Sequence, residues 1–296
     1  MKYTEEAVLF SCHGDTLLGI VAKPEVTAET GVIVVVGGPQ YRAGSHRQFV
    51  LLSRVLATAG YPVLRFDYRG MGDSEGQQRG FRSVSSDIAA AIDTLQRCVP
   101  SVRHVALWGL CDGASAALLY RFDTQDPRVS TLCLLNPWIR SETSFARTQI
   151  KHYYTQRLVE KEFWTKLFKG KVGHKAISEL LRSVQLAVAG RMHSAPRACA
   201  PDWTTATPLP YQQRMAQAWD NFTGNILLLL SGDDYTAKEF SEYTRNNPAW
   251  KKSMKHPSLT RCELPGADHT FSSATYRAQV EDLTLRLGLP RSGQSH

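Results

Sequence analysis

The chain has 296 residues, of which 43% are hydrophobic and 21% are charged, a composition typical of a globular protein. This composition excludes a disordered chain, a collagen-like repeat and a small disulfide-stapled protein. The 35 lysines and arginines exceed the 27 aspartates and glutamates, so the net charge is +8, and nucleic-acid binding has to be considered.

The sequence carries no signal for a membrane or for a secreted protein. No apolar run approaches the ~20 residues that a membrane-spanning helix needs. The first residues lack a cationic segment followed by a long apolar stretch, so we expect no signal peptide and a cytoplasmic location. The six cysteines are scattered without metal-ligand spacing, and most should be buried thiols. We therefore expect neither a metal nor another cofactor.

Short apolar runs alternate with segments of helical periodicity along most of the chain. The runs with the length and composition of strands cover residues 8–11, 17–22, 31–36, 62–66, 105–108, 129–135, 226–230 and 259–264. The helical segments between and after them cover residues 45–59, 84–98, 114–120, 236–243 and 274–287. This alternation predicts an α/β fold with a mostly parallel eight-stranded sheet and helices on both faces, the first two strands forming an antiparallel edge hairpin.

The alternation stops after the sixth strand. Residues 140–222 have a helical and aromatic pattern without a clear strand, so we expect residues 1–139 and 223–296 to form the core and residues 140–222 a helical cap. The cap segment holds 13 basic and 6 acidic residues, whereas the rest of the chain is nearly neutral. This charge is either a solvated helical face or a lid that attracts an anionic or carrier-linked substrate.

The segment Trp108-Gly-Leu-Cys-Asp-Gly-Ala-Ser115 follows a predicted strand and opens a predicted helix. It has the G-x-nucleophile-x-G pattern of a nucleophile elbow, with Cys111 in the place usually held by serine. Gly109 and Gly113 remove side chains that would collide across the sharp turn. The N-terminus of the following helix favours the thiolate form of the cysteine, so Cys111 is the candidate nucleophile.

A nucleophile of this kind needs a base and an acid that orients the base, and α/β hydrolases place the acid before the base in the chain. His269 follows the last strand and is the candidate base. Asp234 follows the strand before it and is the candidate acid, with the neighbouring Asp233 as the alternative. Both segments lie at the carboxyl ends of strands, where parallel sheets build their sites.

An oxyanion hole should come from two backbone N–H groups. One is the N–H of Asp112, directly after the nucleophile. The second belongs to the turn Gly37-Gly38-Pro39-Gln40, where Pro39 has no N–H and Gln40 is preferred over Gly38. The carboxylate of Asp112 opposes thiolate formation in Cys111, and it either contacts the substrate or caps the helix locally.

Several motifs together resemble the α/β-hydrolase superfamily over nearly the whole chain. Asp67-Tyr-Arg-Gly-Met-Gly-Asp-Ser74 is similar to the family's D-x-R-G-x-G-x-S segment, which is usually structural. The Gly-Gly-Pro-Gln-Tyr-Arg, Gly-Leu-Cys-Asp-Gly-Ala-Ser and Leu-Ser-Gly-Asp-Asp-Tyr-Thr segments resemble the hydrolase-1 family associated with exosortase A systems. That resemblance implies an accessory hydrolase of an exopolysaccharide or envelope-sorting system, and cysteine in place of serine departs from the commoner members.

The residues therefore predict an enzyme that hydrolyses or transfers the acyl group of an ester or thioester through an acyl-cysteine intermediate. Its partner is a small acyl substrate. The alternative is a non-catalytic binding protein that retains the fold and uses the cleft for recognition. Nucleic-acid binding is disfavoured because the basic residues are interleaved with apolar helix positions and no nucleic-acid module is recognisable.

Overall fold

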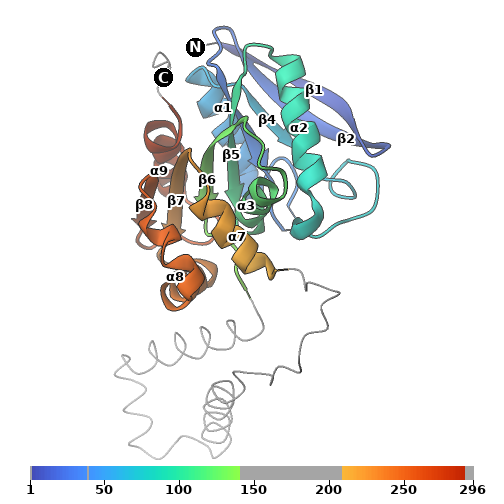
Figure 1. The fold of residues 1–296 in the computed structure, drawn as a ribbon. Helices are drawn as coiled ribbons and strands as arrows, with labels where there is room; N and C mark the ends of the chain where they lie inside the picture. The colour runs from blue at the N-terminus through green and yellow to red at the C-terminus, as the bar shows by residue number, and fades with distance from the viewer. Residues whose placement is uncertain (1, 39, 141–208, 291–296) are drawn as a thin grey trace, which may run out of the picture. The chain divides into compact units, whose positions relative to one another are not determined.

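The computed structural model describes residues 2–38, 40–140 and 209–290. Their strands form one eight-stranded sheet in the order β1-β2-β4-β3-β5-β6-β7-β8 (Figure 1). The strands are β1 (Tyr3–Cys12), β2 (Asp15–Pro24), β3 (Thr30–Val35), β4 (Val63–Phe66), β5 (His104–Leu110), β6 (Val129–Leu135), β7 (Asn225–Ser231) and β8 (Leu259–Leu264). The α/β fold predicted from the alternating pattern is confirmed.

The sheet is antiparallel at one edge and parallel elsewhere. β1 and β2 form a hairpin, β2 pairs antiparallel with β4, and every later pairing is parallel. All residues of β3 and β4 are buried, as expected for strands covered on both faces, and this explains their continuous apolar sequences. The carboxyl ends of β5, β7 and β8 therefore lie along one edge of the sheet, each followed by a loop.

Helices cover both faces of the sheet. The helices of the described residues are α1 (Gln48–Thr58), α2 (Ser85–Cys98), α3 (Asp112–Thr124), α7 (Tyr211–Asp220), α8 (Tyr235–Asn246) and α9 (Ala274–Leu283). α1 contacts α9, whereas α2 contacts α3, which in turn contacts α7. Ala114, Ala116 and Ala117 are fully or almost fully buried, and these small side chains let α3 approach the sheet closely.

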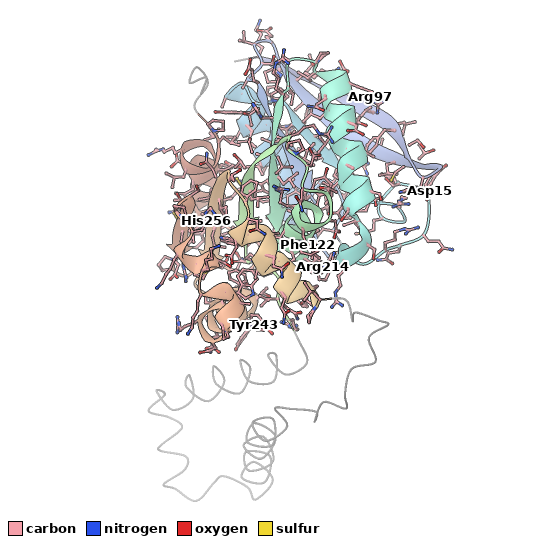
Figure 2. The ribbon with its side chains drawn as sticks, in the orientation of Figure 1. Asp15, Arg97, Phe122, Arg214, Tyr243 and His256 are labelled. Atoms are coloured by element: carbon pink, nitrogen blue, oxygen red, sulfur yellow. The ribbon has the colours of Figure 1, made fainter. Side chains whose placement is uncertain are left out.

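The boundary of the core differs from the one that the sequence predicts. The described elements belong to one compact unit formed by residues 1–139 and 209–296, so α7 lies in the core and not in the cap segment. Arg214 of α7 lies over the ring of Phe122 of α3 at 5.1 Å and forms an ion pair with Asp123 (Figure 2). A helix has the same hydrophobic periodicity whether it belongs to the core or to the cap segment, and only the element on which it packs distinguishes the two. The predicted cap structure of residues 141–208 lies outside the described residues.

The segment after β4 is held by a buried ion pair. Arg69 donates from Nε and Nη2 to the two carboxylate oxygens of Asp87, each at 2.9 Å, and its backbone N–H donates to the same carboxylate at 3.1 Å. Asp87 is fully buried and Arg69 is 3% exposed. The D-x-R-G-x-G-x-S segment thus joins the end of β4 to α2.

Within residues 2–38, 40–140 and 209–290, no helix combines the length and apolar character that crossing a bilayer requires.

We predict that Asp87→Asn lowers the free energy of unfolding by about 3–5 kcal/mol, because it leaves the buried guanidinium of Arg69 without a compensating charge. Urea unfolding followed by circular dichroism measures this change. Asp282→Asn, which removes the exposed i,i+4 ion pair with Arg286, is the control and should cost at most about 0.5 kcal/mol. Equal effects of the two substitutions would contradict the structural role assigned to the buried pair.

Candidate active site

Cys111 occupies the sharp turn between β5 and α3. Its backbone has φ 60° and ψ −124°, a conformation that residues with side chains rarely adopt. Hydrogen bonds hold this conformation: the Cys111 N–H donates to the carbonyl of Leu135 at 2.8 Å, and the Trp138 N–H donates to the carbonyl of Cys111 at 3.2 Å. Cys111 is partly exposed and directly precedes α3, at the end of the helix where the dipole favours a negative charge.

The two glycines of the elbow are needed for the steric reason that the sequence predicts. A Cβ on Gly109 would lie 2.5 Å from the carbonyl carbon of Gly113. A Cβ on Gly113 would collide with the carbonyl oxygen of Val35 and lie 3.2 Å from the backbone nitrogen of Gly37. The elbow therefore packs directly against the turn that follows β3.

His269 and Asp234 meet at the carboxyl ends of β8 and β7. The Nδ1 atom of His269 lies 2.9 Å from Oδ2 of Asp234, whose side chain is 8% exposed. Asp234 also begins α8, where its carboxylate accepts the N–H groups of Thr236 (3.2 Å) and Ala237 (2.9 Å). Asp233 instead has a side chain that is 78% exposed and lies 3.8 Å from Lys238 Nζ. Of the two acids that the sequence offered, the structure brings Asp234 to the imidazole.

The imidazole of His269 interacts with Cys111 as well as with Asp234. Burial by itself would lower the pKa of His269, but hydrogen bonds to Asp234 and Cys111, together with their negative charges, raise it to about 10. In Asp234, burial alone would raise the pKa, and the bonds from His269, Ala237 and Thr236 outweigh it, so its pKa is lowered. His269 thus lies between the carboxylate of Asp234 and the sulfur of Cys111, and both raise its pKa.

Other described cysteines lack this environment. Cys133 is fully buried in β6, and burial raises its pKa to about 12. Burial also raises the pKa of Cys12 and of Cys262. A thiol held in its protonated form is a poor nucleophile. Among these residues, Cys111 is the thiol with a base at hand.

Asn136 is a site residue that the sequence analysis missed. It is fully buried at the end of β6 with a positive φ of 44°. Its Nδ2 donates to the hydroxyl of Ser231 (2.8 Å) and to the carbonyl of His269 (3.0 Å), and its Oδ1 accepts the Ser231 N–H at 2.8 Å. The Ser231 hydroxyl in turn donates to the carbonyl of Asp268 at 2.8 Å. This network ties the loop that carries His269 to β6 and β7. The sequence signal that could have identified Asn136 is its position as a polar residue directly after a buried strand.

The turn after β3 is anchored from the segment that follows β4. Asp67 accepts the backbone N–H of Arg42 at 2.7 Å and also pairs with the guanidinium of Arg42, which reaches Asp73 at 2.6 Å. Within the turn, the Gln40 N–H donates to the carbonyl of Gly37 at 3.3 Å. Gln40, the preferred second oxyanion donor, would have to release this long hydrogen bond to serve an oxyanion.

The side chain of Asp112 lies between the elbow and this turn. Its Oδ1 is buried, and a Cβ on Gly37 would collide with it. Burial raises the pKa of Asp112, and the N–H groups of Gly38, Asp112 and Gly113 and the charge of His269 oppose that rise without cancelling it. The backbone N–H of Asp112 has no backbone acceptor among the residues described, although it acts on the carboxylate of its own side chain, and its role as an oxyanion donor stays a prediction.

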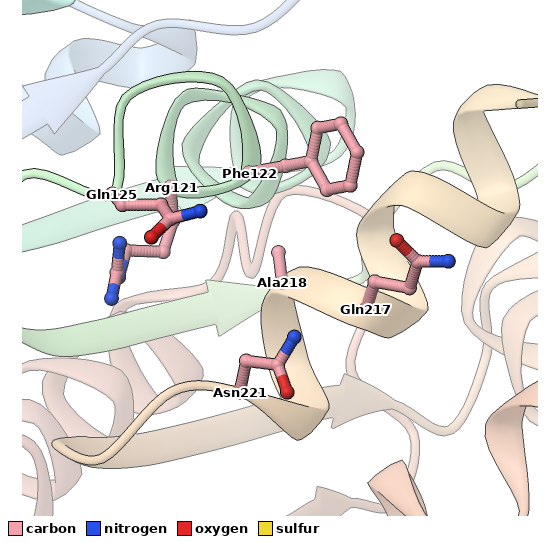
Figure 3. A pocket seen from close by; sticks show the side chains of 6 residues that line it. All are labelled: Arg121, Phe122, Gln125, Gln217, Ala218 and Asn221. Atoms are coloured by element: carbon pink, nitrogen blue, oxygen red, sulfur yellow. The ribbon is translucent and has the colours of Figure 1, made fainter. Parts of the chain in front are cut away.

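A separate cavity of about 420 Å³ lies beside α3 and α7 (Figure 3). None of the candidate nucleophile, base, acid or oxyanion residues lines it. Its walls are formed by Arg121, Phe122, Gln125, Gln217, Ala218 and Asn221.

We predict that Asp234→Asn lowers the pKa of His269 from about 10 toward its ordinary value of about 6.5, because the substitution removes a negative partner but retains a side chain that can cap α8. In the parent protein the imidazolium persists up to about pH 10, so its contribution to stability is complete below the unfolded value of about 6.5 and is lost as the pH rises through 10. NMR titration of the labelled His269 ring measures the shift. Asp233→Asn is the matched control, and a pKa equally lowered in both variants would contradict the assignment of Asp234.

We predict that Asn136→Ala costs about 1–3 kcal/mol of stability, because the buried Ser231 N–H loses its acceptor. Urea unfolding measures the cost, and Asn225→Ala at the exposed start of β7 serves as control. The His269 ring resonances should also broaden or shift in Asn136→Ala, since the loop loses its tie to β6. A stability and a spectrum equal to those of the control would show that the network does not position the histidine.

The fold is similar to that of solved esterases and hydrolases. An esterase of Pyrococcus furiosus superposes with a TM-score of 0.61 and 14% identity, covering 97% of this chain and 94% of the other. Est1E of Butyrivibrio proteoclasticus, solved with ferulic acid bound, gives 0.58 at 15% identity over 95% and 99% of the two chains. A dienelactone hydrolase of Anabaena variabilis gives 0.58 at 14% identity over 96% of each. At these identities the likeness concerns the fold.

Two curated relatives match shorter parts of the sequence. The lysophosphatidylserine lipase ABHD12 of Danio rerio is 34% identical over 116 residues, which are 38% of this chain and 29% of that protein. Human protein ABHD12B is 33% identical over 86 residues, 29% of this chain and 23% of that protein. This chain thus spans less than a third of the length of each of these relatives. Residues 32–283 match the alpha/beta hydrolase family as a whole, and the chain therefore belongs to that family.

Proposed function

We propose that this protein hydrolyses esters or thioesters, or transfers their acyl groups, with Cys111 as nucleophile, His269 as acid and base, and Asp234 as the orienting acid. The observation that carries the proposal is the 2.9 Å contact between the imidazole of His269 and the carboxylate of Asp234. Cys111 also interacts with this imidazole and raises its pKa. An arrangement of this kind is the one that activated nucleophiles use on unrelated folds. The named esterases and lipase among the similar proteins support acyl chemistry.

The charge state of the pair decides how the reaction begins. Because the pKa of His269 is raised to about 10, the imidazole is a strong enough base to take the proton of Cys111 and to hold it as an imidazolium. The thiolate adds to the substrate carbonyl carbon, and the carbonyl electron pair moves to oxygen. When the tetrahedral adduct collapses, the imidazolium of His269 protonates the leaving oxygen or sulfur, and an acyl-Cys111 thioester remains.

Cys111 and His269 also account for the release of the acyl group. In the acyl-enzyme the sulfur carries no charge, so the thiolate no longer raises the pKa of His269. The imidazole, neutral since it gave its proton to the leaving group, therefore stays neutral and acts as base: it takes the proton of water or of an acceptor hydroxyl as the oxygen attacks the thioester carbon, and collapse of the adduct expels the sulfur of Cys111. A thiolate is both a good nucleophile and a good leaving group, and this suits thioester substrates and acyl transfer as well as hydrolysis.

Three further parts of the proposal rest on the sequence. The basic residues of 140–222 suit an anionic or carrier-linked substrate through electrostatic attraction. The resemblance of three motifs to exosortase-associated hydrolases suits an accessory role in an exopolysaccharide or envelope-sorting system. We place the protein in the cytoplasm, where the free cysteines of the described residues stay reduced.

We predict a burst of p-nitrophenol from p-nitrophenyl acetate equal to the enzyme concentration, because acylation of Cys111 should outpace its release. Intact-protein mass spectrometry should show one acetyl group, located on Cys111 by peptide mapping. Cys111→Ala should abolish the burst, and His269→Ala should slow it by about 10²–10⁴-fold through loss of acid–base catalysis. Cys98→Ala, which removes another partly exposed thiol, is the control and should leave the burst unchanged.

A panel of acyl-coenzyme A thioesters, compared with p-nitrophenyl esters of the same acyl chains, then separates thioesterase from esterase activity. A protein that binds these compounds without acetylation of Cys111 would contradict the proposal and favour a non-catalytic binding protein.

A further inference from the structure

Ser115 is a buried serine in a stretch of α3 that otherwise carries alanine. Its side chain is fully buried, and its neighbours Ala114, Ala116 and Ala117 are fully or almost fully buried as well. A hydroxyl in such a place costs free energy unless it forms a hydrogen bond, and alanine fills nearly the same volume without that cost. The bonding partner of the Ser115 hydroxyl therefore indicates what this side chain does.

The partner of the hydroxyl lies outside the helix. A serine inside a helix commonly bonds to the carbonyl four residues earlier, which here belongs to Cys111. That carbonyl oxygen lies 3.5 Å from Oγ of Ser115, whereas the carbonyl oxygen of Trp138 lies at 2.6 Å and accepts the hydrogen bond. A hydroxyl has one proton to donate, so the shorter contact takes it. Ser115 thus ties α3 to the segment that follows β6.

This segment, residues 135–138, also holds the backbone of the nucleophile. The carbonyl of Leu135 accepts the Cys111 N–H at 2.8 Å, and the Trp138 N–H donates to the carbonyl of Cys111 at 3.2 Å. These two bonds hold both peptide groups of a residue whose φ of 60° is disfavoured for a side chain. Trp138 therefore bonds to the elbow through its N–H and to Ser115 through its carbonyl.

The same segment holds the base. Asn136 donates from Nδ2 to the carbonyl of His269 at 3.0 Å, and two hydrogen bonds of 2.8 Å join Asn136 to Ser231. Residues 135–138 are thus hydrogen-bonded to the backbone of Cys111 and to the backbone of His269. The position of this segment relative to α3 therefore affects how closely the sulfur and the imidazole approach each other.

We propose that Ser115 is a positioning residue: its hydroxyl holds residues 135–138 against α3 and thereby sets the separation between Cys111 and His269. The inference rests on the proposed function and adds a residue that supports its site. Ser115 is fully buried, and it acts only through the segment that it holds. Without the hydroxyl, the carbonyl of Trp138 loses its donor, the segment shifts more freely, and the sulfur is less often within bonding reach of the imidazole.

NMR titration of the labelled His269 ring tests this inference without a substrate. The interaction with Cys111 raises the pKa of His269, so a looser contact between the two residues lowers that pKa. We expect Ser115→Ala to move the pKa of His269 from about 10 part of the way to the value found in Cys111→Ala. In the Cys111→Ala background, Ser115→Ala should cause no further shift, because no thiol remains to be displaced.

The rate of acylation by p-nitrophenyl acetate gives the catalytic readout. We expect Ser115→Ala to slow acylation of Cys111 by about 10–10²-fold, because the reacting groups are misplaced. Alanine is a better helix former than serine, so the variant should fold, and thermal unfolding checks this. Ser53→Ala is the matched control, because Ser53 is also fully buried in a helix, α1, but its hydroxyl has no partner among the residues described. The control should keep the parent's acylation rate and the parent's pKa of His269.

The inference requires both changes in Ser115→Ala. If either the acylation rate or the pKa of His269 keeps the parent's value, Ser115 does not set a separation that catalysis uses. An equal fall of the His269 pKa in the Cys111→Ala background would also overturn the inference, since the change would then concern the histidine loop alone. A parent protein that is never acylated on Cys111 would overturn the proposed function, whereas the titration would still decide whether Ser115 sets the contact between Cys111 and His269.

Discussion

The site depends on one strained residue. Cys111 keeps a side chain at φ 60° and ψ −124°, a conformation that costs about 1–3 kcal/mol unless the surrounding structure holds it. β5 and β6 supply that hold, because the Cys111 N–H bonds to β6 and its carbonyl accepts from α3 and from Trp138. The sheet thus stabilises a backbone turn that lifts the sulfur out of the core and places it at the start of a helix.

Ionisable side chains and the residues that anchor them surround this sulfur. Asp234 is anchored by the N–H groups of α8, His269 bridges it to Cys111, and Asn136 fixes the loop from which the imidazole projects. The side chain of Asp112, the residue after the nucleophile, packs against Gly37, and its Oδ1 is buried. The two carboxyl groups have opposite environments: hydrogen bonds lower the pKa of Asp234, whereas burial raises the pKa of Asp112.

The candidate site and its supports come from distant parts of the chain. Asp67, after β4, holds Arg42 of the turn after β3, and that turn packs against the elbow after β5. The buried ion pair between Arg69 and Asp87 fixes the segment that carries Asp67 to α2. The D-x-R-G-x-G-x-S segment thus supports the site from below, which explains how residues that touch no substrate can be needed for its geometry.

The sequence by itself determined the order of strands and helices, the elbow at Cys111 and the candidates His269 and Asp234, because hydrophobic periods and glycine positions act over a few residues. β6 and β8 have the predicted limits, since apolar runs end where turns begin. Only the tertiary structure decided that Asp234 and not Asp233 faces the imidazole, that α7 packs on α3, and that Asn136 ties the histidine loop to β6. Those outcomes depend on which way a side chain points from a turn and on what a helix packs against, and neither is encoded in a local pattern.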